Sequence, residues 1–142
     1  MSIAAIDLGR RRIGVAVTDA INAGAYPLGT VERSSFKRDV EAIAAMLRGR
    51  EVTAIVVGLP FNMDGSEGPA ARSSRKYGER LAKVFSVKVE MFDERLTSFE
   101  AEERLKGMPI RRGSKKAANS VDAIAAAVIL ERWLEARARK SS

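Results

Sequence analysis

Three acidic residues of this chain have settings that suit metal-assisted chemistry: Asp7, Glu94 and Asp122. Asp7 follows the apolar run IAAI and precedes a glycine and three arginines, Glu94 lies in FDERLTS, and Asp122 lies in SVDAIAAAVIL. Carboxylates that converge repel one another unless a hard cation lies between them, and Mg²⁺ accepts oxygen ligands from carboxylates and phosphates alike. We therefore expect a site for Mg²⁺ or Mn²⁺ that faces a phosphodiester, where two ions would activate a water and stabilise the leaving oxygen.

Each acid also has a simpler interpretation. Asp7 fits a turn that starts a hairpin before a glycine, and Asp122 would complement the dipole in the first turn of a helix. Glu94 would pair with the neighbouring Arg95, and Asp93 would then replace it as the ligand. Further acidic candidates are Asp19, Asp64 and Glu67.

The chain contains no histidine and no cysteine. Without histidine it cannot form a Ser-His-Asp triad or use paired histidines as general acid and base. Without cysteine it has no disulfides, thiolate nucleophiles or cysteine zinc sites. Any hydrolytic chemistry must therefore come from carboxylates, lysines or metal ions.

The net charge of +7 favours anionic partners, of which nucleic acid is the commonest. Two basic segments would contact the phosphates of such a partner without reading its bases. The first follows Asp7, and the second is a loop from Gly107 to Lys116, for which the alternative is an ordinary solvated loop. The residues expected to bind nucleic acid are Arg10, Arg11, Arg12, Arg111, Arg112, Lys115 and Lys116.

The residue pattern also predicts the elements that position these groups. Apolar runs predict strands and apolar residues at helical spacing predict helices, with Ser34 or Ser35 capping the first helix and Asn119 or Ser120 the last. The expected strands are residues 2–7, 12–18, 26–32, 52–60 and 87–92. The expected helices are residues 36–47, 69–85, 97–105 and a last one that ends near residue 137.

The links between these elements predict the topology. The tight link between the first two strands implies an antiparallel hairpin, and the helices between the third, fourth and fifth strands imply that the later strands run parallel to the first. We expect an α/β fold of the ribonuclease H-like type, a mixed five-stranded sheet with three antiparallel strands, then two parallel ones, and helices on both faces. Because open α/β sheets bind ligands at the carboxyl ends of their strands, Asp7, Glu94 and Asp122 would converge at that edge.

The segment GLPFNMDGSEGP, Gly58 to Pro69, leaves the fourth strand and leads into a helix. Its backbone amides would suit a phosphate, as helix N-termini do, or the segment is an ordinary polar turn. The longest apolar helical segment, residues 123–130, is well short of the roughly 20 residues of a membrane span. We expect one domain over residues 1–142, no membrane partner and a cytoplasmic location.

Four segments together carry a resemblance to a known family: DLGRRRIGVAVTD, GLPFNMDGSEGP, FDERLTS and VDAIAAAVIL. In order and spacing they resemble the motifs of the YqgF (RuvX) family, described as pre-16S rRNA nucleases and also as Holliday junction resolvases. The match spans nearly the whole chain, and the acidic positions of the family match Asp7, Glu94 and Asp122.

The resemblance implies a metal-dependent bacterial nuclease that matures the 5′ end of pre-16S rRNA in ribosome biogenesis. Asp7 and Asp122 would bind the metal, and Glu94 would be a further ligand or the base that orients the attacking water. The alternatives are a Holliday junction resolvase acting on branched DNA and a non-catalytic RNA-binding module, and the protein would be a monomer or a homodimer. Sugar kinases and actin-like ATPases also begin with an Asp-x-Gly strand, but they need two domains to enclose a nucleotide.

Overall fold

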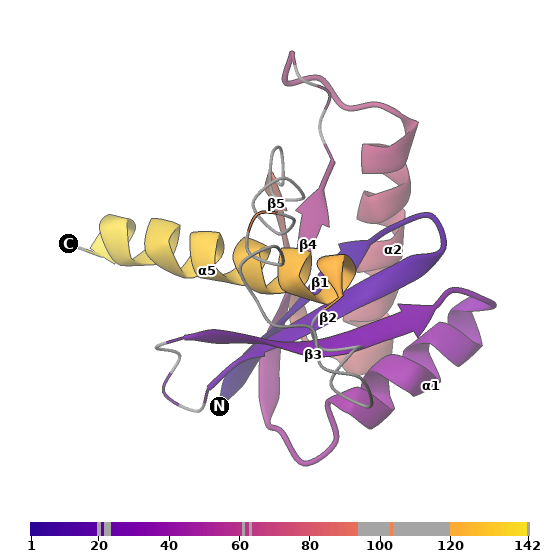
Figure 1. The fold of residues 1–142 in the computed structure, drawn as a ribbon, viewed down its shortest axis with the longest axis horizontal. Coiled ribbons are helices and arrows are strands. Elements are labelled where there is room, and N and C mark those ends of the chain that lie inside the picture. Colours follow the sequence, from indigo (N-terminus) through magenta and orange to yellow (C-terminus); the bar gives the residue numbers. More distant parts are fainter. Residues whose placement is uncertain are drawn as a thin grey trace.

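The computed structural model describes residues 1–19, 21, 24–60, 62, 64–93, 103 and 120–141. These residues form a five-stranded sheet with helices on both faces (Figure 1). The strands are β1 (Ser2–Leu8), β2 (Arg12–Thr18), β3 (Ala25–Glu32), β4 (Val52–Leu59) and β5 (Lys88–Asp93). The helices are α1 (Phe36–Met46), α2 (Pro69–Phe85) and α5 (Val121–Ser141).

The strand order is β3-β2-β1-β4-β5. β1 pairs antiparallel with β2, and β2 with β3, whereas β1 pairs parallel with β4 and β4 with β5. The predicted mixed sheet is therefore confirmed. Consequently β1, β4 and β5 all point their carboxyl ends to the same edge of the sheet.

The two faces of the sheet carry different helices (Figure 1). Alternate residues of β1 divide between them: Ala4 and Ile6 pack toward α1 and α2, whereas Ile3 and Ala5 pack toward α5. We call these the α1–α2 face and the α5 face. Because side chains alternate along a strand, the face of every further strand residue follows from this register.

The helix starts have simple local causes. The hydroxyl of Ser35 accepts a hydrogen bond from the N–H of Arg38 at 3.2 Å, which makes Ser35 the N-cap of α1. α2 follows Gly68 and has Pro69 at its first position, where no N–H is needed. The hydroxyl of Ser120 accepts from the N–H of Ala123 at 3.2 Å, so Ser120 caps α5.

One expected helix boundary needs correction, and one expected helix stays untested. α5 runs to Ser141 rather than ending near Arg137, because the residues after Arg137 include good helix formers and neither glycine nor proline. The helix expected at 97–105 lies outside the described residues apart from Glu103. Within the described residues, no helix combines the length and apolar character of a membrane span.

Candidate functional site

Asp7 lies near the carboxyl end of β1 and is half-buried. Since Ile3 and Ala5 pack on the α5 face, the alternation of β1 places Asp7 on that face as well. Its partner across the β1–β2 ladder is Gly14, which therefore lies on the same face directly beside it.

Asp122 lies in the first turn of α5 and is also half-buried. The start of α5 rests on Gly14 so closely that a Cβ atom there would lie 1.9 Å from the carbonyl oxygen of Asp122 and 2.4 Å from its carbonyl carbon. Only glycine allows this contact between strand and helix backbones. Because Gly14 lies opposite Asp7, the contact brings Asp7 and Asp122 to one place on the α5 face.

The side chain of Asp122 reaches toward the β1–β2 turn. A Cβ atom built on Gly9 would lie 3.8 Å from Oδ1 of Asp122. The small residues of α5 allow this approach, because Ala126 and Ala127 pack against Ala5 and Ala16 of the sheet. Near its middle, α5 is fixed to β5 by Trp133.

The indole N–H of Trp133 donates to Oε2 of Glu90 at 2.6 Å. This hydrogen bond lowers the pKa of the Glu90 carboxyl below its ordinary value, since it stabilises the charged form. Trp133 itself is buried against the sheet. α5 is thus held by Gly14 under its first turn and by Glu90 near its middle.

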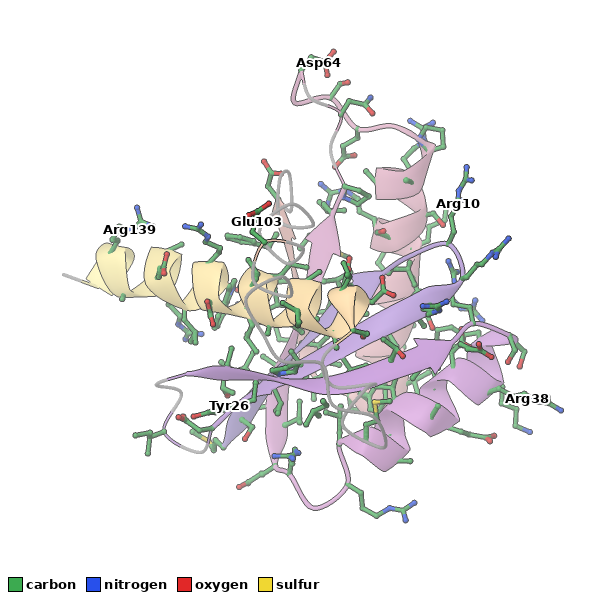
Figure 2. All side chains as sticks on the ribbon, viewed as in Figure 1. Arg10, Tyr26, Arg38, Asp64, Glu103 and Arg139 are labelled. Carbon is green, nitrogen blue, oxygen red and sulfur yellow. The ribbon has the colours of Figure 1, made fainter. Side chains whose placement is uncertain are left out.

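The three predicted arginines surround the turn that follows Asp7. The N–H of Gly9 donates to the carbonyl of Arg12 at 2.9 Å, which closes the turn and exposes Arg10 and Arg11 at its tip. Figure 2 shows Arg10 pointing outward from this tip. Arg12 begins β2 and, two residues before Gly14, lies on the α5 face with Asp7.

Arg33 also belongs to this turn, although the sequence analysis did not identify it. Its Nη1 donates to the carbonyl of Gly9 at 2.9 Å, and its backbone N–H donates to the carbonyl of Arg11 at 2.8 Å. The available sequence signal was a basic residue directly after the third strand, in VERSS. That signal does not by itself point to Gly9.

Asp93 does not join the two aspartates. It pairs with Leu59 at the end of the β4–β5 ladder and follows Phe92, which packs on the α5 face. Alternation therefore places Asp93 on the α1–α2 face, beside Met91 and away from Asp7. Glu94 lies outside the described residues, so its place as a ligand stays a prediction.

Two of the other acidic candidates, Asp64 and Glu67, form local contacts. Asp64 accepts hydrogen bonds from the N–H of Ser66 at 2.9 Å and from its hydroxyl at 2.6 Å, and Figure 2 shows Asp64 at the tip of the loop after β4. Glu67 pairs with Arg75, whose hydrogen bond lowers the pKa of the Glu67 carboxyl. Asp19 follows β2 at the sheet edge opposite to that of Asp7.

The loop after β4 is organised by its own hydrogen bonds. The N–H of Asn62 donates to the carbonyl of Ser66 and the N–H of Gly65 to the carbonyl of Asn62, both at 2.8 Å, and Gly65 adopts a φ of 89°. With Asp64 inside it, the described part of the loop reads as a polar turn rather than as a phosphate cradle.

The donors at the carboxylate site suit a hard divalent cation. Asp7 and Asp122 offer carboxylate oxygens at a half-exposed position, which Mg²⁺ and Mn²⁺ prefer to nitrogen or sulfur ligands. Across the described ranges, no three or more carboxylates form a group that could hold a metal ion. A third carboxylate ligand, for which Glu94 is the prediction, would lie outside the described residues. The predicted basic residues Arg111, Arg112, Lys115 and Lys116 also lie outside the described residues.

Comparison with known families matches almost the whole chain. A family model described as RuvX: Holliday junction resolvase matches residues 1–136. A relative from Anaeromyxobacter sp. (strain K), named "Putative pre-16S rRNA nuclease", is 51% identical over 133 residues, which cover 94% of this chain and 96% of the relative. A relative of the same name from Myxococcus xanthus (strain DK1622) is 44% identical over 131 residues, covering 92% and 85%.

Solved structures share the fold at low sequence identity. RuvC from Thermus thermophilus is similar with a TM-score of 0.56 and 20% identity, covering 98% of this chain and 97% of RuvC. A fowlpox virus resolvase solved with Holliday junction DNA gives a TM-score of 0.57 and 13% identity, covering 96% and 99%. These likenesses support the ribonuclease H-like arrangement that the strand order displays.

Proposed function

This chain belongs to the RuvX family, and from that premise we propose that it is a metal-dependent nuclease that processes the 5′ end of pre-16S rRNA. The observation that carries the proposal is the contact of α5 with Gly14, which brings Asp122 beside Asp7 at the carboxyl edge of the sheet. Metal-assisted phosphodiester hydrolysis uses such oxygen ligands, and the chain has no histidine for general acid–base catalysis. A cytoplasmic location fits a chain without cysteine.

Each residue of the site then has a defined task. Asp7 and Asp122 would hold Mg²⁺ or Mn²⁺, which when bound polarises the phosphate and lowers the pKa of the attacking water. Glu94 completes the ligand set or accepts the proton of that water. Arg12 lies on the same face as Asp7 and neutralises the phosphate next to the cleaved bond, while Arg10 and Arg11 contact flanking phosphates from the turn.

The substrate assignment rests on the curated relatives. The matched relatives are named for pre-16S rRNA at up to 51% identity, which favours a structured RNA precursor. The second candidate is a four-way DNA junction, favoured by the family description and by the likeness to a resolvase solved on such DNA. A non-catalytic RNA-binding module is the third, and it differs from both by lacking cleavage. Cutting a junction on two strands suits a dimer, whereas processing one RNA end suits a monomer.

To test this proposal, the cleavage rates of the wild type and of Asp7→Asn are measured once with Mg²⁺ and once with a chelator. The substrates are a pre-16S rRNA fragment that contains the 5′ processing site, a four-way DNA junction and plain duplex. Glu41→Gln is the matched control, because it removes one negative charge from the exposed surface of α1. We expect cleavage of the RNA by wild type and control, and a loss of roughly 10³-fold or more in Asp7→Asn, as removal of a metal ligand implies.

Other outcomes separate the candidates. Cleavage of the junction alone would replace the RNA assignment with the resolvase assignment. Binding without cleavage of any substrate, by folded wild type with metal, would leave only the RNA-binding module. Full activity in Asp7→Asn would remove the carboxylate site from the mechanism.

A further inference from the structure

Two exposed arginines lie over a pair of aromatic rings beside the β1–β2 turn. The rings of Phe36 and Tyr77 meet edge to face, with centroids 5.2 Å apart. The guanidinium of Arg80 lies 3.7 Å from the centroid of Phe36, and that of Arg33 lies 5.6 Å from the centroid of Tyr77. We call Arg33, Phe36, Tyr77 and Arg80 the arginine–aromatic cluster.

The cluster has a fixed base. The hydroxyl of Tyr77 donates to Oδ2 of Asp39 at 3.0 Å, and Oδ1 of Asp39 accepts from the N–H of Ser34 at 2.9 Å. Asp39 is only 2% exposed. Its carboxylate therefore ties α2 to the link between β3 and α1, which carries Arg33, and so sets the position of both arginines.

The cluster is also continuous with the predicted phosphate-binding turn. Arg33 donates to the carbonyl of Gly9, two residues after Asp7, and its backbone pairs with Arg11. A strand that passes the carboxylate site and crosses Arg10 and Arg11 would thus meet Arg33 next. From there the surface continues along α2 to Arg80.

The charges of the cluster are not neutralised. Among the residues that the structure describes, neither Arg33 nor Arg80 forms an ion pair, and both are exposed. The nearby carboxylate of Asp39 is buried and already bonded to Tyr77 and Ser34. Lys76 and Lys83 extend the exposed positive charge on α2 around Arg80 at helical spacing.

Stacking leaves the arginines well suited to phosphate. Arg80, 3.7 Å from the Phe36 centroid, keeps its N–H donors for a bidentate contact, and Arg33 keeps those that do not bond to Gly9. The orientation of each guanidinium is set in advance, so less side-chain entropy is lost when a phosphate binds. A solvated lysine lacks both advantages.

We propose that the arginine–aromatic cluster binds the sugar–phosphate backbone of the nucleic acid where the strand leaves the carboxylate site. This inference rests on the proposed function, because it takes nucleic acid as the substrate. It adds a contact surface on the α1–α2 side of the turn, whereas the carboxylates lie on the α5 face. The turn Gly9–Arg12 lies between the two.

The experiment measures binding in chelator, where no cleavage is needed. The probes are a fluorescein-labelled RNA hairpin and a labelled four-way DNA junction, titrated by anisotropy between about 50 mM and 200 mM salt. The variant is Arg33→Gln/Arg80→Gln. The control is Arg48→Gln/Arg50→Gln, which removes the same charge at the far end of α1, where both residues are exposed.

Loss of two phosphate contacts should lower the slope of log affinity against log salt by roughly 1.4 to 1.8. At about 0.1 M salt this corresponds to roughly 25-fold to 60-fold weaker binding. The control should lose at most about threefold. Equal losses in variant and control would overturn the inference, because they would show a general effect of charge.

Arg33→Gln also removes a hydrogen bond to the turn, so Arg80→Gln alone is measured as well. Among the described residues, Arg80 forms no hydrogen bond with the turn, so Arg80→Gln should still weaken binding several-fold with unchanged thermal unfolding. An unchanged affinity in Arg80→Gln would overturn the inference. Because these readouts use binding only, they stand apart from the cleavage test: active Asp7→Asn would refute the catalytic proposal and leave this surface in place.

Discussion

Asp93 and Glu94 are neighbours in the chain, but the register of β5 gives Asp93 to the face away from Asp7. We predict that Glu94→Gln reduces cleavage by at least roughly 10²-fold, as loss of a ligand or base does, while Asp93→Asn stays within about threefold of wild type. Cleavage rates of both variants, measured at saturating Mg²⁺, check this. The reverse ranking would mean that Asp93 is the ligand and that the strand ends differently at the site.

The second prediction at the residue scale concerns Tyr77. Burial and the hydrogen bond to Asp39 raise the pKa of Tyr77 well above its ordinary value of 10.0. The folded chain therefore binds the proton of the Tyr77 hydroxyl more tightly than the unfolded chain does. The contribution of this protonated hydroxyl to stability is complete below about pH 10 and declines as the pH rises above that value.

Urea unfolding between about pH 8 and pH 11 checks this decline. Tyr77→Phe should be less stable by about 1 to 3 kcal/mol at neutral pH, because Asp39 loses a donor, and should show a shallower alkaline decline. Tyr26→Phe is the control, since Tyr26 is 53% exposed. Identical alkaline slopes in wild type and Tyr77→Phe would contradict the argument.

At the scale of elements, the start of α5 is positioned by Gly14. Gly14→Ala would place a methyl group 1.9 Å from a helix carbonyl oxygen, which no side-chain rotation can relieve. We predict a loss of about 3 kcal/mol or more in the free energy of unfolding. Where the variant is still folded, cleavage should fall roughly 10²-fold, because displacement of Asp122 by about 1 Å is enough for that.

Gly24→Ala is the matched control for Gly14→Ala. A Cβ atom there would meet the hydroxyl of Tyr26 at 3.6 Å, an ordinary contact. Thermal unfolding followed by circular dichroism, together with cleavage rates, compares the two variants. Gly14→Ala with the stability and activity of the control would show that α5 does not rest on β2 in solution.

At the scale of the whole molecule, the sheet was predictable because its signals are local. Apolar runs, turn residues and the length of each connection predict the five strands and their relative directions, whereas the order β3-β2-β1-β4-β5 and the register that assigns Asp7 to a face come from the structure. The α5 N-cap at Ser120 was likewise predictable from residue type. These signals can be identified without knowing which elements pack against each other.

The remaining features depend on tertiary contacts that no spacing rule reports. Asp39 is buried in α1, where the hydroxyl of Tyr77 and the N–H of Ser34 donate to its carboxylate. Arg33 looked like one more surface cation, and only the fold brings it to Gly9. The closeness of Gly14 to Asp122 is also a contact between elements far apart in sequence.

The backbone contact between α5 and Gly14 also limits how the sequences of this fold can diverge. The spacing of Asp7 and Asp122 is set where two main chains touch, and main-chain atoms are the same whatever side chains the core carries. Exchanges among Ile, Val and Leu elsewhere in the core can therefore accumulate without changing the distance between Asp7 and Asp122. Many apolar residues are therefore acceptable at most core positions, whereas only glycine is acceptable at position 14.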